Sequence, residues 1–265
     1  MIKIGNKKYK ICLLDTNIIS DGLKNKTPIF KNIINRFSFD EYCWALTPST
    51  VLELSELKSY HTELSRLLAL FPNIVTKGLK ELKQEEFETY KNNKNFNITL
   101  FSFNGLSHKG KQLNPKAVEI FLKSSEIRQL GLKINLQESS LLELILSYKK
   151  NYPPDKNGKY SKKRIQEFGN MIVRRIIQED YPEFYAQHSS LDIIHFKSLL
   201  ISILFTFYKF YPDQRRALTS DLNDISISGV LPYVDTFIGE GNMIEIINKL
   251  NNLNKDLGLI VKKGC

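Results

Sequence analysis

The chain has 265 residues, 42% of them hydrophobic, and a formal net charge of +10 at pH 7. Three cysteines without paired or metal-type spacing exclude a disulfide scaffold, and the lysines that follow Met1 leave no apolar core for a secretory signal. We therefore expect a soluble, cytoplasmic globular protein, built as one large domain or as a domain with a sizeable insertion.

The first informative element is a buried strand over residues 11–14, a continuous apolar run. A strand that is apolar at every position is buried on both faces, which is typical of the centre of a parallel sheet. The run ends at Asp15, so this carboxylate is expected at the C-terminal edge of the sheet, where open α/β folds bind ligands. Strand propensity gives no reason for an acid at the end of a buried strand, which makes Asp15 the leading functional candidate.

A second short apolar run, Cys43–Leu46, is followed by Thr47 and Pro48 and then by a helical pattern. Thr47 is placed to cap this helix, and Pro48 falls in the first turn, where proline is tolerated. Glu53 then lies about one turn into the helix, near the strand-to-helix corner. A second carboxylate is therefore expected close to the edge that carries Asp15.

Helical patterns dominate the next part of the chain. A helix is predicted near residues 79–92, and it leads into an Asn-rich segment over residues 90–97. Another helix is predicted to start at Asn114 and Pro115, an asparagine cap followed by a proline in the first position. Its expected end is Gly131, because glycine commonly follows the last helical residue.

Two more helices are predicted further along. Ser140 and Glu143 have the spacing of a capping box at the start of a new helix. The prolines within residues 152–155 break the chain, and residues 160–180 then carry apolar side chains on one helical face.

The longest apolar stretch runs from Leu191 to Tyr211, and it is interrupted by Asp192, His195, Lys197 and Lys209. Its uncharged centre, residues 198–208, is shorter than the roughly 20 residues that span a bilayer. We therefore expect a helix buried in the protein core. His195 lies three residues after Asp192, and a buried, hydrogen-bonded histidine is favoured over a functional pair.

Two further acidic elements lie near the end of the chain. Residues 220–224 start a helical segment that contains Asp221 and Asp224. A β-rich run follows, preceded by Asp235 and ended by Glu240. Each of these acids is expected where a strand or helix meets a loop.

These stretches together resemble the PIN-domain nucleases. The resemblance rests on residues 13–17 for the first motif, 47–54 for the second and 221–240 for the last two. It implies an α/β fold with a three-layer α/β/α core around a central parallel sheet. In that family, clustered acids hold Mg²⁺ or Mn²⁺ and hydrolyse RNA, less often DNA.

The last two motifs depart from the family pattern. The family usually has an aspartate just after its fourth strand, whereas here Glu240 holds that place and Asp235 precedes the strand, so either could complete the acid cluster. Both Asp221 and Asp224 qualify as the acid at the helix start. Being three residues apart, they would share one helical face.

The chemistry explains why several carboxylates would gather. Hard divalent cations prefer oxygen ligands, and the water that they keep can become the attacking hydroxide at phosphorus. Two ions about 4 Å apart would stabilise both the attacking and the leaving oxygen. The candidate catalytic residues are Asp15, Glu53, Asp221, Asp224, Asp235 and Glu240.

Roles can be assigned from the resemblance. Asp15 and Asp224 are expected as direct metal ligands, with Glu53 and Asp221 contributing ligands or holding metal-bound waters. Asn17 or Thr16 would orient Asp15 or a scissile phosphate through hydrogen bonds.

Most of these acids also have a structural interpretation. Glu53 lies three residues after Thr50 and could close a capping box. Asp221 and Asp224 lie in a first helical turn, where acids stabilise the helix dipole.

Basic residues gather between Lys149 and Arg175, where nine bases face two acids, whereas acids outnumber bases after Leu218. This distribution is expected of an enzyme that grips a phosphate backbone and cuts it. The nucleic-acid-binding candidates are Asn17, Lys159, Lys162, Lys163, Arg164, Arg174 and Arg175. An ordinary solvated surface is the alternative, and the RNA path would then use Lys109, Lys111, Arg215 and Arg216.

Two other functional classes compete with a nuclease. A phosphatase of the haloacid-dehalogenase type needs a second aspartate two residues after the first, and Asn17 occupies that position. The stronger rival is a PIN-like fold that has lost catalysis and binds nucleic acid or a partner protein.

The sequence thus predicts a metal-dependent endoribonuclease that needs Mg²⁺ or Mn²⁺. Residues 1–75 and 191–265 are expected to form the PIN-like core, and residues 76–190 a mainly helical, basic insertion. RNA is the expected partner, with DNA as an open alternative and no membrane. The resemblance also suggests a toxin or defence role, an inhibitor (antitoxin-like) protein and a homo-oligomer.

Overall fold

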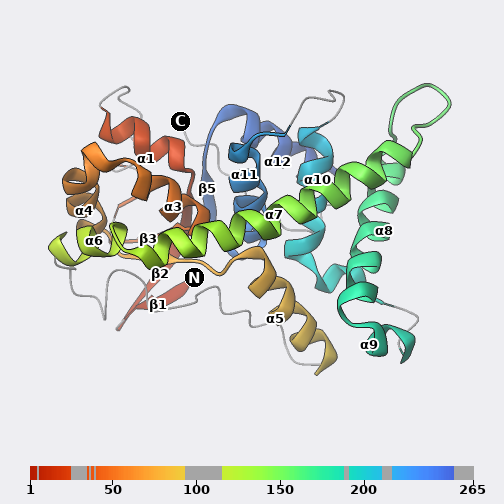
Figure 1. Ribbon diagram of the computed structural model, residues 1–265, viewed down its shortest axis with the longest axis horizontal. Coiled ribbons are helices and arrows are strands. Elements are labelled where there is room, and N and C mark those ends of the chain that lie inside the picture. The colour runs from red at the N-terminus through yellow and green to blue at the C-terminus, as the bar shows by residue number, and fades with distance from the viewer. Residues whose placement is uncertain are drawn as a thin grey trace.

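The computed structural model describes residues 1–4, 6–24, 35, 37–38, 40–92, 115–187, 191–210 and 217–253. Part of the predicted Asn-rich segment, the Asn114 cap and the bases Lys109, Lys111, Arg215 and Arg216 lie outside these ranges. In the described residues, one small sheet is surrounded by helices in a mixed α/β arrangement (Figure 1).

The described elements follow one another from β1 near the N-terminus to α12. The strands are β1 (Ile2–Ile4), β2 (Lys7–Leu14), β3 (Tyr42–Leu46), β4 (Asn73–Val75) and β5 (Thr236–Ile238). The α-helices are α1 (Thr16–Leu23), α3 (Pro48–Glu56), α4 (His61–Leu70), α5 (Leu79–Lys91), α6 (Pro115–Leu122), α7 (Ser125–Asn151), α8 (Lys162–Asp180), α9 (Pro182–Gln187), α10 (Lys197–Lys209), α11 (Thr219–Val230) and α12 (Gly241–Leu253). Short 3-10 turns are η1 (Lys58–Tyr60), η3 (Ile193–His195) and η4 (Leu231–Tyr233).

The strand β2 is the centre of the sheet, as its apolar sequence predicts. On one edge it pairs in parallel with β3, which in turn pairs in parallel with β4. On the other edge, its C-terminal half pairs in parallel with β5, and its N-terminal half forms an antiparallel hairpin with β1. The prediction of a buried central strand in a parallel sheet is confirmed.

The order of the parallel strands is β4, β3, β2, β5. The chain moves from β2 to β3 and β4 on one side, and it returns to the other side of β2 for β5. The order therefore reverses at β2. In open α/β sheets, the crevice outside the carboxyl ends of the strands at such a reversal is where ligands bind.

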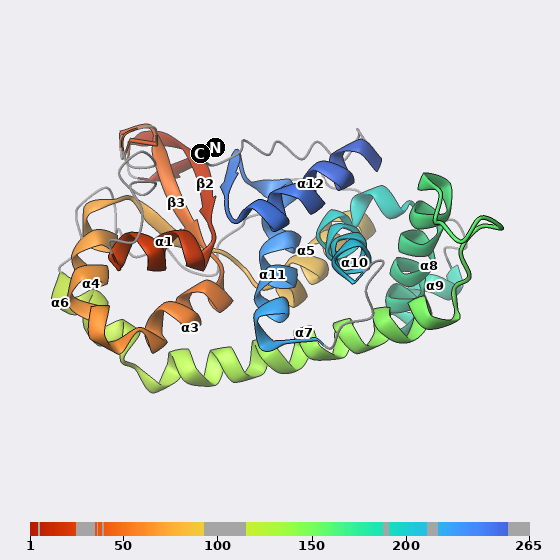
Figure 2. The ribbon, with the colours of Figure 1, turned by 90° about the horizontal axis from the view of Figure 1, so that it is seen from above.

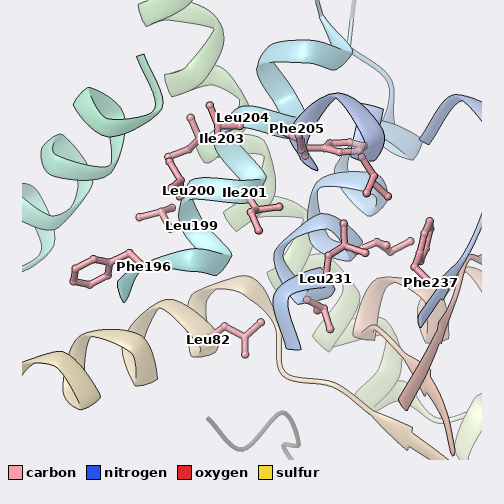
Figure 3. Close-up of a cluster of buried hydrophobic side chains, with 14 of the residues drawn as sticks. Leu82, Phe196, Leu199, Leu200, Ile201, Ile203, Leu204, Phe205, Leu231 and Phe237 are labelled. Atoms are coloured by element: carbon pink, nitrogen blue, oxygen red, sulfur yellow. The ribbon is translucent and has the colours of Figure 1, made fainter. Parts of the chain in front are cut away.

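Side chains of alternating strand residues enter two different hydrophobic clusters. Ile11 and Leu13 join a cluster with helices α8, α10 and α12, whereas Cys12 and Leu14 join a cluster with α3, α4 and α6. Figure 3 shows part of the first cluster, which extends from the labelled side chains of α10 to Phe237 of β5. Helices therefore cover both faces of the sheet.

Helix α7 is continuous over residues 125–151, so the predictions of a helix end at Gly131 and a capping box at Ser140 are wrong. A Cβ atom at Gly131 would collide with the side chain of Leu52, so the glycine serves the close approach of α7 to α3. The Ser140 hydroxyl donates to the Leu136 carbonyl at 3.0 Å, a bond that lies inside the helix.

The described helices of residues 76–190 do not form a separate core. Leu82, Ile145, Phe168 and Ile172 join the same cluster as Leu13 of the central strand. Helix α7 runs along the molecule from α6 and α3 at one end to α8 at the other (Figures 1 and 2). The helical segment is therefore packed onto the sheet through shared apolar side chains.

Helix α10 is buried along residues 198–207, as the apolar stretch predicts. Within the described ranges, no helix combines the length and apolarity that a membrane crossing requires. His195 lies in the preceding turn, 3.4 Å from Asp192, which caps that turn by accepting the Ile194 amide.

Glu86 of α5 is a fully buried acid that ties three elements together. Its Oε1 accepts the Ser198 amide at 2.7 Å and also the Tyr233 hydroxyl. Burial raises the pKa of this carboxyl to about 7, although the hydrogen bonds oppose the shift.

We expect Glu86→Gln to change how stability depends on pH. Between about pH 4.5 and pH 7, the Glu86 carboxyl is protonated in the folded protein but ionised in the unfolded chain. The wild type therefore loses stability as pH rises through this range. The uncharged glutamine avoids this loss, which amounts to on the order of 3 kcal/mol at pH 8. Urea unfolding at pH 5 and pH 8 measures the difference, with Glu88→Gln on the exposed face of α5 as control. Equal pH dependence of wild type and Glu86→Gln would contradict the assignment.

Candidate active site

Asp15 lies between β2 and α1, at the C-terminal edge of the sheet. It caps α1, since its Oδ1 accepts the Asn17 amide at 3.4 Å, and its Oδ2 accepts the Glu240 amide at 3.4 Å. The residue is only 4% exposed. Asp15 thus joins the ends of β2 and β5 at the point where the strand order reverses.

The electrostatic surroundings of Asp15 are unusual for an aspartate. Burial, followed by the negative charge of Asp224, raises the pKa of its carboxyl to about 7. The two amide bonds oppose the rise, and Glu240 adds to it. Asp15 makes no ion pair within the described residues, so its charge is opposed by two other acids and balanced by no base.

Glu53 approaches the same place from α3. Thr47 caps that helix as predicted, accepting the Thr50 amide at 3.1 Å. Glu53 does not close a capping box; its Oε1 accepts the side-chain amide of Asn223 on α11. Burial raises the pKa of Glu53, as does Asp224, whereas Thr16 and Asn223 lower it. Glu53 is thus electrostatically coupled to Asp224, as Asp15 is.

Asp221 and Asp224 share one face of α11, as predicted, and that face meets Lys209. Asp221 Oδ2 accepts the Leu218 amide at 2.7 Å, which completes a helix cap, and its Oδ1 lies 3.1 Å from Lys209 Nζ. Asp224 forms an ion pair with the same Nζ. Both oxygens of Asp221 are therefore engaged within the protein, whereas Asp224 also raises the pKa of Asp15 and of Glu53.

Asp235 and Glu240 are the two candidates for the last acid of the cluster, and the pairing register of β5 with β2 decides where each of them lies. Asp235 precedes β5 and accepts the Ile11 amide at 2.8 Å, with the amino group of Met1 3.1 Å away. Because Ile11 lies four strand residues before Asp15, Asp235 sits about 13 Å away, at the opposite edge. The structure therefore places Asp235 away from the other predicted acids, and Glu240 is the acid beside Asp15.

Asn17 and Thr16 flank Asp15 on α1. The exposed Asn17 donates from Nδ2 to Glu240 Oε1 at 2.7 Å, so it links the first turn of α1 to the loop after β5. The Thr16 hydroxyl is buried near the Glu53 carboxyl and lowers the pKa of that group. Both residues lie where the sequence places them, next to the acid cluster.

The sequence reasoning missed Lys209 and Asn223. Lys209 ends a mostly apolar, buried helix, and its side chain is only 7% exposed. A lysine at the end of such a helix indicates a buried acidic partner, although the sequence of the chain does not identify that partner. Asn223 carries no such signal, because its contact with Glu53 joins residues 170 positions apart.

The predicted basic cluster lies on and beside α8. Lys162 donates to the Asn252 carbonyl and Arg174 to the Leu191 carbonyl, while Arg175 pairs with Glu179. Arg164 stacks on Tyr152 and lies between Asp155 and Glu167. Lys159 and Lys163 are exposed.

The basic cluster and the acid cluster are far apart. Arg174, Arg175 and Tyr148 line an open pocket of about 460 Å³ between α7 and α8. Along α7, Tyr148 is 17 residues from Gly131, which packs beside α3, so the two regions are about 25 Å apart. Figures 1 and 2 show α8 and α1 at opposite ends of the molecule.

Mg²⁺ and Mn²⁺ need several oxygen ligands close together. Within the described ranges, no three His, Cys, Asp or Glu side chains are arranged to hold a metal ion as they stand. A hard cation nevertheless suits the carboxylate oxygens of Asp15, Glu53, Asp224 and Glu240. The negative charge of Asp224 raises the pKa of Asp15 and of Glu53, and Glu240 raises that of Asp15. Asp221 is engaged by the helix cap and by Lys209.

Comparison of the chain with models of known protein families, with curated proteins and with solved structures finds no match.

Proposed function

We propose that the protein is a metal-dependent endoribonuclease with a PIN-like, three-layer core. Support comes from the four parallel strands with helices on both faces and from the acids at the strand-order reversal. Mg²⁺ or Mn²⁺ is the proposed cofactor, and RNA is the proposed substrate.

The burial of Asp15 among other acids is the observation that carries the proposal. A structural carboxylate is usually balanced by a base or fully satisfied by backbone amides. Asp15 has two long amide contacts, no described base, and the charges of Asp224 and Glu240 nearby. Such an arrangement costs free energy in the folded protein, and a bound cation would remove that cost.

Each residue of the acid cluster has a proposed role. Asp15, Glu53 and Asp224 would hold the cation, which would supply a hydroxide nucleophile and stabilise the leaving oxygen. Glu240 and Asn17 lie at the exposed side of the cluster, hydrogen-bonded to each other. They are placed to orient the water or the scissile phosphate that enters from solvent.

The proposed substrate path extends to the basic cluster. The part of α7 between Gly131, beside α3, and Tyr148, in the pocket, is about 25 Å long, so contact with both regions favours a folded or long RNA over a short oligonucleotide. Growth inhibition through RNA cleavage, with an inhibitor protein as partner, is the biological role that we propose for such an activity.

We expect the double variant Lys159→Gln, Lys163→Gln to bind RNA more weakly. Losing two phosphate contacts should flatten the dependence of log affinity on log salt by up to about two units, with little change in turnover at saturating RNA. Fluorescence anisotropy over a salt series measures the slope. The control is the double variant Lys3→Gln, Lys8→Gln, which removes the same charge from the β1–β2 hairpin. Equal slopes in the two double variants would assign Lys159 and Lys163 to an ordinary solvated surface.

The experiment that tests the function uses purified protein and total RNA, with Mn²⁺, with Mg²⁺ and with chelator. We expect new RNA ends in the presence of either metal and intact RNA with chelator. Sequencing the new ends would identify the substrate. Intact RNA and intact single-stranded DNA under all conditions would contradict the proposal.

A binding module without catalysis is the second candidate, favoured by one observation. Lys209 already neutralises part of the acid cluster, pairing with both Asp221 and Asp224. Such a module would bind RNA equally well with metal and with chelator and would cut nothing. Asp15→Asn would then leave RNA affinity unchanged or improved.

A further inference from the structure

A second pocket, of about 440 Å³, lies between helices α5, α7, α8 and α10. The residues described in its wall come from these four helices, so the pocket is separate from the acids around Asp15. Its apolar wall is formed by the side chains of Leu79, Leu141, Leu144, Ile176 and Leu199. A pocket of this size and lining can bury the apolar body of a small organic molecule.

One buried acid of α7 also lines this pocket. Glu138 is 3% exposed, and its Oε2 has no hydrogen-bond partner within the described residues. Burial raises the pKa of this carboxyl to about 8. The Ser226 hydroxyl, on α11, approaches Glu138 and lowers the pKa, but without the geometry of a full hydrogen bond. A buried polar group left in this state costs free energy, which a hydrogen-bond donor on a ligand would recover.

The other charged side chains at this pocket are paired or solvated. Lys83 pairs with Asp180, and Glu179 pairs with Arg175. Lys80 is exposed to solvent.

The remaining neighbours of Glu138 carry no charge, since α10 brings the apolar Leu199 to the pocket and α11 brings Ser226. Glu138 therefore offers a buried acidic group to a ligand. An ammonium is its best partner, because charge-assisted hydrogen bonds are about twice as strong as neutral ones.

We propose that this pocket binds a small organic amine, with the ammonium group paired to Glu138 and the apolar body against the leucine and isoleucine side chains. The inference is independent of the proposed metal site and of RNA cleavage, because it uses a different set of residues.

Binding of the amine is expected to release a proton. In the ligand-free protein at pH 7, about nine-tenths of the Glu138 carboxyls are protonated. The bound alkylammonium keeps its own proton, because such groups titrate near pH 10, so the Glu138 proton passes to the solvent as the carboxylate forms. The expected release is about 0.9 proton per bound amine at pH 7, and the affinity should rise about 20-fold from pH 6.5 to pH 8.5.

Calorimetric titration of the wild-type protein with hexylamine, hexan-1-ol and hexanoate tests the inference. The three probes share an apolar chain and differ in the end group. We expect hexylamine to bind about tenfold or more tightly than either of the others at pH 8.5. Repeating the hexylamine titration at pH 7 in two buffers with different heats of ionisation counts the protons that are released.

Glu138→Gln removes the acid and keeps the size of the side chain. It is expected to fold at pH 7, since glutamine is uncharged like the protonated carboxyl that it replaces. The variant should bind hexylamine no more tightly than hexan-1-ol and release no proton. The matched control is Glu143→Gln, on the exposed side of the same helix, which should bind hexylamine as the wild type does.

Several results would overturn the inference. They are no binding of hexylamine, equal binding of the three probes, tighter binding of hexanoate than of hexylamine, and hexylamine binding without proton release at pH 7. Equal affinity of Glu138→Gln and Glu143→Gln for hexylamine would overturn it as well. Should Glu138→Gln fail to fold, the proton count and the order of the three probes in the wild type decide the question.

Discussion

Asp15→Asn is expected to lower the rate of RNA cleavage at saturating Mn²⁺ by about 100-fold or more, while the protein stays folded. The asparagine keeps the size of the side chain, but the Asn17 and Glu240 amides bind different oxygens of Asp15, so the single carbonyl oxygen of asparagine can accept only one of them. The variant also removes the charge that Asp224 and Glu240 repel, so the metal-free variant should be about as stable as wild type. Single-turnover cleavage and urea unfolding measure the two effects.

Asp235→Asn is the matched control for that variant. It makes the same chemical change at the other edge of the sheet, beside Ile11, and should cut RNA at nearly the wild-type rate. If Asp15→Asn cut as fast as Asp235→Asn, Asp15 would be a helix cap without a catalytic role.

Trp44→Ala is expected to cause the largest loss of stability. Trp44 lies on β3, is fully buried, and stacks on Phe71 with ring centroids 4.0 Å apart. Truncating a buried aromatic side chain removes its apolar contacts and leaves a cavity, which costs about 3–5 kcal/mol. Urea unfolding monitored by circular dichroism measures this loss.

Leu132→Ala provides the reference for the Trp44 experiment. Leu132 is 66% exposed on α7, so its truncation should cost less than about 0.5 kcal/mol. Similar losses in the two variants would contradict the packing of β3 against α3 and α4.

The sheet could be predicted because its signals are local. Four consecutive apolar residues before Asp15 indicate a doubly buried strand, and Thr47 with Pro48 marks the start of α3. The pairing of β1 with β2 was not predicted, because the charged residues Lys7, Lys8 and Lys10 make the first half of β2 hard to recognise as a strand. The continuity of α7 was missed because Gly131 serves a contact with Leu52, which no local pattern reveals.

The candidate site could be predicted only in part. The positions of Asp15 and Glu53 follow from where a strand ends and a helix begins. The choice between Asp235 and Glu240 depends on the register in which Leu14 pairs with Ile238, which is a long-range property. Lys209 was missed for the same reason, since its partners on α11 lie 12 and 15 residues further along the chain.

We propose that the acids at the C-terminal edge of the sheet bind a divalent cation. Crystals soaked in Mn²⁺ and measured near the manganese absorption edge would test this binding, because the anomalous signal locates the ion. We expect a peak that contacts carboxylate oxygens of Asp15, Glu53 and Asp224, and no such peak in Asp15→Asn crystals. A Mn²⁺ peak found only elsewhere, with the Asp15 carboxylate facing protein atoms alone, would show that these acids do not form a metal site.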